Sequence, residues 1–481
     1  MRRVFVSTLV LVVIAALAPA QPARLSAALE AALTGPDGGT QKVWVYLRDK
    51  GGAAGQPASV SPRALARRAL RGNAGEADGW EERPIDPAYV GAIAEGSTRV
   101  RQVSRWFGAV SVEATADQVR ALAALPFVAR LDVVRGYRAR PGDETGGTRK
   151  ASSAPSTSRP PATPLDYGDS FEQLEQIHVP SVHDLGFHGE GVVIAMFDAG
   201  FSKLAHEVFA STRIVARHDF VNGDGGVGNG SDRGEGSHGT ATLSVIGGFR
   251  AGELIGPAFA AEYVLAKTED TESETPIEED NWAAAAEWAE ALGVDVVSTS
   301  LGYLTFDPPF QSYTPAEMNG KTAIVTRAAE KLAARGVVVV ASAGNSGFNP
   351  SHNTLGAPAD GRHVLAAGAV GSFGERADFS SVGPTADGRI KPDVAARGVL
   401  VKAASSATTS GYELVSGTSF SCPLTAGVAA LVLQAHPTYT VNQVRAVLRS
   451  TASQASDPDN LLGYGIVNAL AAVRAQAPPS R

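Results

Sequence analysis

From Leu165 onward, short apolar runs alternate with segments of helical periodicity. The predicted strands span 191–198, 262–268, 293–302, 336–345 and 363–370. Candidate helices lie between several of them, notably at 281–292 and 322–336. Apolar strands that alternate with helices are typical of a parallel sheet covered by helices on both faces. The pattern predicts a doubly wound α/β fold, in which ligands bind at the carboxyl ends of the strands.

A smaller region precedes this pattern. Residues 42–48 and 108–114 alternate apolar and polar side chains, as half-buried strands do, and 61–72 is a candidate helix between them. Thr115 and Gln118 have the spacing of a capping box at the start of a second helix. A further strand follows. The region is therefore predicted to be a small sandwich of helices and strands, and the helix at 61–72 is predicted to be one of its helices.

Two segments are predicted to lie outside both folded regions. Residues 1–20 hold two arginines, an apolar run and a small-residue site at the end, which is typical of a secretory signal peptide. The alternative, a membrane anchor, is disfavoured because the run is shorter than the ~20 residues that a spanning helix needs. Residues 141–163 are rich in Pro, Ser, Thr and Gly, so they are predicted to be a flexible linker that contains a processing site.

Charge and cysteine content limit the possible partners. The formal net charge is -7 and there is no long Lys/Arg run, which removes the electrostatic basis for binding a phosphate backbone. We therefore expect no nucleic-acid partner. Cys422 is the only cysteine, so an exported chain would need packing or bound ions, rather than disulfides, for its stability.

Three short motifs could carry chemistry. Ser419 in GTSFS precedes a strongly apolar helix, and we expect Pro423 in the first turn of that helix. At the start of a helix, Ser419 would lie beside free backbone N–H groups that could hold an oxyanion. A lone serine in this position is more often a helix cap. His238 begins another helix in SHGT, and Asp198 ends a strand before a glycine turn. Each of these two alone has an ordinary reading, a surface histidine and a turn aspartate.

Taken together and in this order, DAG, HGT and GTSFS resemble the subtilisin-like serine peptidases over roughly residues 165–475. The resemblance implies that Asp198 orients an imidazole, that His238 is general base and then acid, and that Ser419 attacks the scissile carbonyl. It also implies that Asn345, at the end of VVVVASAGN, donates to the oxyanion together with the Ser419 N–H group.

The resemblance extends to the substrate. In STSLG, the backbone of Ser300, Leu301 and Gly302 would pair with an extended peptide by strand addition. One departure is Phe420-Ser421-Cys422 where the family has Met-Ala followed by Ser or Thr. We expect Cys422 to be a buried, inert thiol; the alternative is a second nucleophile.

Residues 105–134 resemble the inhibitory propeptide of the same family, which implies a ferredoxin-like α+β domain that assists folding and occupies the cleft until it is cleaved. A stable accessory domain is the alternative. The predicted division is a signal peptide at 1–20, a propeptide at 21–140, a linker at 141–163, a catalytic domain at 164–475 and a tail at 476–481.

Two polar stretches have open interpretations. The acidic residues 269–280 could favour basic substrate residues or form a solvated loop. Asp219, Asn222 and Asp224 offer oxygen ligands for structural Ca²⁺, but they lack the spacing of an EF-hand, and we expect no metal there. No cofactor is needed for the chemistry.

The sequence therefore predicts a secreted serine endopeptidase, extracellular or periplasmic, that is made as a self-processing zymogen. The expected partners are protein or peptide substrates and its own propeptide, with no membrane association after signal removal and a monomeric state. A catalytically silent peptide-binding relative is the main alternative. An α/β-hydrolase esterase is disfavoured, because that fold runs Ser, Asp, His and needs GxSxG at its serine.

Overall fold

The structure is a computed structural model. It describes residues 23–34, 39–52, 60–72, 79–134, 165–228, 236–270, 279–304 and 312–478. The predicted signal peptide at 1–20 and the predicted linker at 141–163 lie outside the described residues, as do 271–278 of the acidic stretch and the end of the tail at 479–481.

A seven-stranded parallel sheet organises the C-terminal part, residues 165–478. Its strands, in spatial order, are β14 (Val394–Arg397), β13 (Leu365–Val370), β12 (Val338–Ser342), β11 (Val296–Thr299), β6 (Val193–Asp198), β10 (Glu262–Lys267) and β7 (Arg213–Asp219). From β6 the chain first adds β7 and β10 on one side and then β11 to β14 on the other. The topological switch point therefore lies between β6 and β11, which is where such sheets bind ligands.

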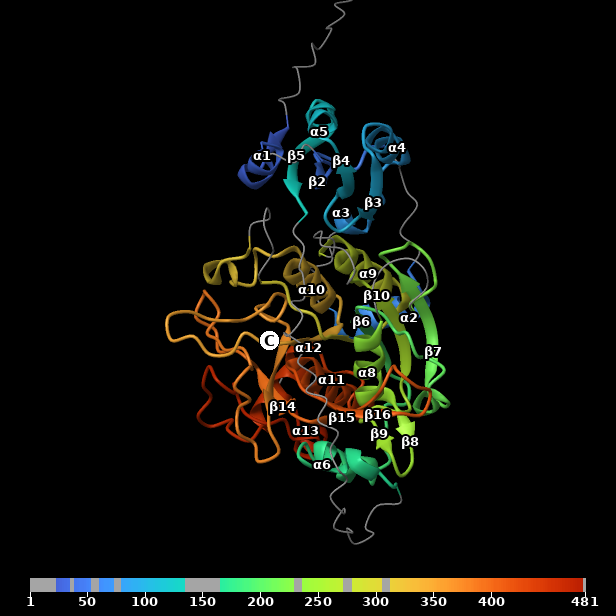
Figure 1. The fold of residues 1–481 in the computed structure, drawn as a ribbon, viewed down its shortest axis with the longest axis vertical. Helices are drawn as coiled ribbons and strands as arrows, with labels where there is room; N and C mark the ends of the chain where they lie inside the picture. The colour runs from blue at the N-terminus through green and yellow to red at the C-terminus, as the bar shows by residue number, and fades with distance from the viewer. Residues whose placement is uncertain are drawn as a thin grey trace, which may run out of the picture.

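Helices cover both faces of this sheet (Figure 1). The helices on one face are α9 (Glu279–Leu292) and α10 (Ile324–Ala334); those on the other are α8 (Ser237–Gly247), α11 (Thr418–Ala435), α12 (Val441–Ser450) and α13 (Ala469–Arg474). Successive side chains of a strand point to opposite faces. In β6, Val193 and Ala195 accordingly pack in the cluster of Trp282 on α9, whereas Ile194 and Met196 pack against α8 and α11. The predicted doubly wound α/β fold is confirmed.

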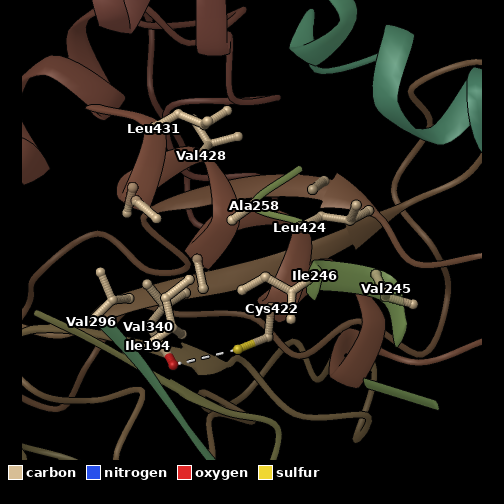
Figure 2. Close-up of a cluster of buried hydrophobic side chains, with 14 of the residues drawn as sticks. Ile194, Val245, Ile246, Ala258, Val296, Val340, Cys422, Leu424, Val428 and Leu431 are labelled. Carbon is tan, nitrogen blue, oxygen red and sulfur yellow. Dashed lines mark hydrogen bonds between the residues drawn. The ribbon is translucent and has the colours of Figure 1, made fainter. Parts of the chain in front are cut away.

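Figure 2 shows the core on the α11 face, where Cys422 packs among Ile194, Val340 and Leu424. The thiol is fully buried and lies 3.4 Å from the Val340 carbonyl oxygen, and burial raises its pKa to about 12. The thiol is thus buried as expected, and it stays protonated at neutral pH. In the part of the chain that the structure describes, α11 is the one helix that could cross a membrane by length and composition, and 89% of that stretch is buried inside the protein.

The N-terminal part, residues 23–134, is built on a second sheet. Its strands, in spatial order, are β1 (Arg24–Leu25), β5 (Val128–Val133), β2 (Gln41–Leu47), β4 (Ala109–Ala114) and β3 (Arg99–Ser104). Its helices are α1 (Ala27–Leu33), α4 (Pro87–Glu95) and α5 (Ala116–Ala123). The strands pair antiparallel except for β1, which joins β5 in parallel. The capping box that Thr115 and Gln118 predict is present at the start of α5.

This sheet packs against α9 and α10, which lie between the two sheets (Figure 1). Trp44 and Trp106 belong to the same buried cluster as Trp282 of α9. The helix predicted at 61–72 forms as α2 (Pro62–Arg71), but its predicted place in the N-terminal sandwich is wrong. Its side chains hydrogen-bond to the C-terminal part, because they find acceptors at the ends of α9 and α10. Short α3 (Gly79–Glu82) follows it.

Smaller elements complete the C-terminal part. They are α6 (Phe171–Glu175), α7 (Val179–His183), the pair β8 (Phe249–Arg250) and β9 (Leu254–Ile255), the hairpin β15 (Val401–Ala404) and β16 (Tyr412–Val415), and single 3-10 turns at Gly168–Ser170, Glu207–Phe209 and Pro315–Glu317.

Candidate active site

Asp198 and His238 are in direct contact. Asp198 is the last residue of β6 and is fully buried, and His238 Nδ1 donates to its Oδ1 at 2.6 Å. The Ala199 N–H group donates to the same oxygen at 2.8 Å, and the Thr242 hydroxyl donates to Oδ2 at 2.8 Å. The carboxylate is therefore held by donors on both oxygens. Because Nδ1 carries the donated proton, Nε2 is the basic nitrogen of the imidazole.

A close approach of two backbone segments brings His238 to Asp198. His238 is in the first turn of α8, next to Gly239. A Cβ atom at Gly239 would lie 2.2 Å from the Gly200 carbonyl oxygen, a distance that real Cβ atoms do not reach. Only glycine at 239 therefore lets the start of α8 contact the turn after β6.

Ser419 is the second residue of α11 and is 6% exposed. In the first turn of a helix the backbone N–H groups have no intrahelical acceptor, so the Ser419 N–H group can serve another one. Gly417 precedes the helix with φ of 153°, a conformation that L side chains rarely adopt. The Phe420 ring, next to Ser419, lies 5.9 Å from the His238 ring between centroids, so the imidazole lies beside the first turn of α11.

Pro423 lies in the second turn of α11, because the helix begins at Thr418, one turn earlier than its apolar run suggests. Proline has no N–H group, so the carbonyl oxygen four residues earlier, on Ser419, loses its helical donor. The Ser300 hydroxyl replaces that donor at 2.8 Å. In return, the Ser419 hydroxyl donates to the Ser300 carbonyl oxygen at 3.3 Å.

Asn345, just beyond the end of β12, has its side-chain amide oriented by Thr418. The Thr418 N–H group (2.9 Å) and hydroxyl (2.8 Å) both donate to Asn345 Oδ1. These bonds fix the amide so that Nδ2 lies on the side of Gly417, where a Cβ atom would be 3.5 Å away. The structure thus presents an N–H donor close to the start of α11.

Ser300, Leu301 and Gly302 follow β11 directly, at the switch point beside β6. Leu301 and Gly302 are half-buried, and Tyr303 then pairs with Ala357 in an antiparallel bridge. The predicted substrate segment therefore lies between the end of a central strand and a short bridge, beside the Ser300–Ser419 hydrogen bonds.

Two residues of this constellation were not predicted from the sequence. Thr242 and Thr418 each donate a hydroxyl to one of the predicted site residues, Asp198 and Asn345. The available signal was a hydroxyl residue four positions after the histidine and another directly before the serine. Neither pattern indicates a partner, because the partners are 44 and 73 residues away.

Asp219, one of the three candidate Ca²⁺ ligands, is already bound by other groups of the protein. Asp219 accepts from the Val221 and Asn222 N–H groups and forms a buried ion pair with Lys267 at 3.1 Å. Among the described residues, no group of three or more His, Cys, Asp or Glu side chains is placed to hold a metal ion.

The described carboxylates at the two ends of the acidic stretch 269–280 are buried. They are Glu269, Asp270, Glu279 and Asp280. Tyr313 donates to Glu279, and Arg101 forms an ion pair with Asp280. Direct hydrogen bonds of this kind compensate for the burial of a charge.

Comparison with known proteins identifies relatives of both parts. The subtilase family (peptidase S8) matches residues 189–465, and the peptidase S8 propeptide domain of Bacteroidota matches residues 42–149. Subtilisin NAT of Bacillus subtilis subsp. natto is 32% identical over 305 residues, which are 63% of this chain and 70% of that protein. Subtilisin DY of Bacillus licheniformis is 32% identical over 301 residues, 62% of this chain and 96% of that protein.

A solved structure also has this fold. Fervidolysin from Fervidobacterium pennivorans, a keratinolytic enzyme related to subtilisin, superposes with a TM-score of 0.62 at 22% identity. The match covers 95% of this chain and 63% of the fervidolysin chain, a little under two thirds.

Proposed function

Because this chain belongs to the subtilase family of serine endopeptidases and carries the family's propeptide domain, we propose that it hydrolyses peptide bonds through Asp198, His238 and Ser419. The observation that carries the proposal is the 2.6 Å hydrogen bond from His238 Nδ1 to a fully buried carboxylate. That bond makes Nε2 the base, and the contact of the His238 ring with Phe420, the residue after Ser419, supports the pairing of this imidazole with the serine.

The reaction starts with a change of partner at Ser419. Its hydroxyl exchanges the Ser300 carbonyl oxygen for His238 Nε2 by rotation about the Cα–Cβ bond. As Oγ bonds to the substrate carbonyl carbon, its proton moves to Nε2, and Asp198 stabilises the resulting imidazolium. The same proton passes to the leaving amine when the C–N bond breaks, which leaves an acyl-enzyme. Water then attacks the ester, with His238 again as base, and frees the acid and Ser419.

The oxyanion is held by two donors, Asn345 Nδ2 and the Ser419 N–H group. Thr418 supports the first, because its two bonds to Oδ1 prevent the amide from flipping. In subtilisin, a relative, the loss of one such donor raises the barrier by about 2.7–4 kcal/mol. In this proposal the backbone of Ser300–Gly302 holds the substrate as an added strand beside the oxyanion hole.

The N-terminal part has the role of an intramolecular inhibitor in this proposal. The chain is exported with a signal peptide at 1–20, the propeptide at 21–140 is cut from the catalytic domain at 164–475 within 141–163, and the cut is made by the enzyme itself. The mature enzyme then works outside the cytoplasm as a monomer, with no membrane contact.

A fluorophosphonate probe, which reacts with activated serines, tests the chemistry. We expect a covalent adduct on Ser419 that is lost in Ser419→Ala and in His238→Ala. The absence of an adduct on the mature, folded protein would favour the catalytically silent peptide-binding alternative.

A further inference from the structure

Helix α2 contacts the catalytic sheet at the edge opposite the active site. Its partners Gly191, Asp295 and Arg335 lie just before β6, β11 and β12. The candidate catalytic residues lie at the other ends of the same strands. From Asp295 to Ser300 the chain advances five residues in extended form, which is about 16 Å. Figure 1 likewise shows α2 away from the strands of the N-terminal sheet.

Four arginines of α2 neutralise two carboxylates of the catalytic part. Arg67 and Arg68 pair with Glu290 near the end of α9. Arg63 and Arg71 pair with Asp295. The Arg67 and Glu290 side chains are 1% and 0% exposed, so this pair is fully removed from water. Burial lowers the pKa of Arg67 to about 10, which still leaves it protonated at neutral pH.

The same arginines cap the C-terminal ends of two helices. Arg67 donates to the Val294 carbonyl oxygen at 2.6 Å, just after α9, and to the Arg335 carbonyl oxygen at 3.1 Å, just after α10. Arg63 donates to the Gly293 carbonyl oxygen at 3.0 Å. The last carbonyls of a helix have no intrahelical donor and carry partial negative charge. A cationic helix therefore satisfies both ends at once.

The shape of the surface also fits a helix backbone. A Cβ atom at Gly293 would lie 2.8 Å from the Ala64 backbone nitrogen. At Gly336 it would lie 3.0 Å from the Arg71 backbone. The catalytic part thus has no side chain at the two points where α2 approaches most closely.

We propose that this surface, the α2 dock, is a binding site for the pro region that is separate both from the active-site cleft and from the contact of the N-terminal sheet with α9 and α10, and that it takes an arginine-rich helix. The α2 dock comprises Gly191, Glu290, Gly293–Asp295, Arg335 and Gly336. It holds the cleaved pro region on the enzyme, so the active site becomes available only when α2 dissociates. The inference rests on the proposed function in one respect, that the bound pro region blocks the cleft.

The test measures release of the pro region without using catalysis. In the full chain carrying Ser419→Ala, a recognition sequence for an added site-specific protease is inserted between residues 150 and 151. After that protease has cut, the dissociation rate of the N-terminal fragment is followed by size-exclusion chromatography at low and high salt. Three chains are compared: one without further substitution, one with Arg67→Met and Arg71→Met, and one with the control substitution Arg120→Met. The Arg120 side chain lies on α5 and is 65% exposed.

Removal of one partner of a buried charge pair is costly, so Arg67→Met/Arg71→Met should speed release by about 30-fold or more. The control should release at the unmodified rate, and high salt should speed release least in the double variant. If the double variant does not fold, Arg63→Met replaces it, since that side chain is 42% exposed, and about 5-fold faster release is expected. Release within twofold of the unmodified rate would overturn the α2 dock.

This outcome is independent of the proposed chemistry. A chain that fails to react with the fluorophosphonate probe but shows the expected release rates would refute the proposed catalytic function and leave the α2 dock standing. If the chain reacts with the probe but the N-terminal fragment leaves all variants at the same rate, the α2 dock is refuted and the proposed catalytic function stands.

Discussion

Ser300 and Ser419 exchange two hydrogen bonds, each hydroxyl donating to the other residue's backbone carbonyl oxygen, at 2.8 and 3.3 Å. The shorter bond exists because Pro423 cannot donate to the Ser419 carbonyl. A helix irregularity thereby ties the end of β11, which is proposed to hold the substrate, to the proposed nucleophile.

Ser300→Ala should lower the thermal midpoint of unfolding, because it leaves the buried carbonyl at position 419 without a donor, at a cost of about 1–3 kcal/mol. Pro423→Ala restores a backbone N–H group to the helix, so the same Ser300→Ala change should cost less when Pro423→Ala is present. Thermal midpoints of the four chains, all carrying Ser419→Ala to prevent self-digestion, measure this coupling. If the effects of Ser300→Ala and Pro423→Ala on the thermal midpoint simply add, the proposed role of Pro423 is contradicted.

Thr418→Val should lower kcat about tenfold with little change in KM, because Asn345 keeps one of its two anchoring bonds and its amide becomes less well fixed. Asn345→Ala should lower kcat about 10²–10³-fold. Thr418 acts through Asn345, so adding Thr418→Val to Asn345→Ala should change little. Steady-state kinetics on a peptide substrate decide between this result and independent effects.

Thr242→Val should lower kcat/KM about tenfold, because the Asp198 carboxylate loses a hydroxyl donor inside the protein. Thr242→Ser keeps the hydroxyl and should keep most of the activity. Equal activity of the valine and serine variants would show that this hydroxyl does not position the carboxylate.

His183 should make the fold sensitive to acid. Burial lowers the pKa of His183 to about 4 from its usual 6.5, and both ring nitrogens are engaged, by Tyr167 and by the Pro257 carbonyl. Between pH 6.5 and 4 the unfolded chain binds a proton here that the folded chain does not, so stability falls as the pH falls through this window. The contribution is up to about 3 kcal/mol.

In the Ser419→Ala chain, His183→Gln should therefore reduce the drop in thermal midpoint between neutral pH and pH 4. His352→Gln, at an exposed histidine, is the matched control and should leave the drop unchanged. An unaltered acid response in His183→Gln would assign the sensitivity to other groups.

Much of the C-terminal fold could be predicted because its signals are local. A parallel sheet that is covered on both faces leaves apolar runs such as 191–198, and a run of this kind is visible in neighbouring residues alone. Short motifs at these predicted elements pointed to the candidate site residues. Asp198 and Asn345 follow from motifs at strand ends, and His238 follows from a motif at a helix start.

The features that could not be predicted depend on distant partners. Strand β3 is largely polar because Arg101 and Gln102 contact α9 across the interface rather than an apolar core. Helix α2 lies where it does because its acceptors are more than 200 residues later in the chain. The start of α11 was misplaced because Asn345, 73 residues earlier, caps it.

The central claim is that Ser419 becomes a nucleophile through His238. Its most direct test is intact and peptide-level mass spectrometry of the mature enzyme, quenched in acid during turnover of an activated peptide ester. The claim predicts an acyl group on the fragment that contains Ser419, absent in Ser419→Ala and strongly reduced in His238→Ala. Turnover without an acyl group on Ser419, or acylation that His238→Ala leaves unchanged, would contradict it.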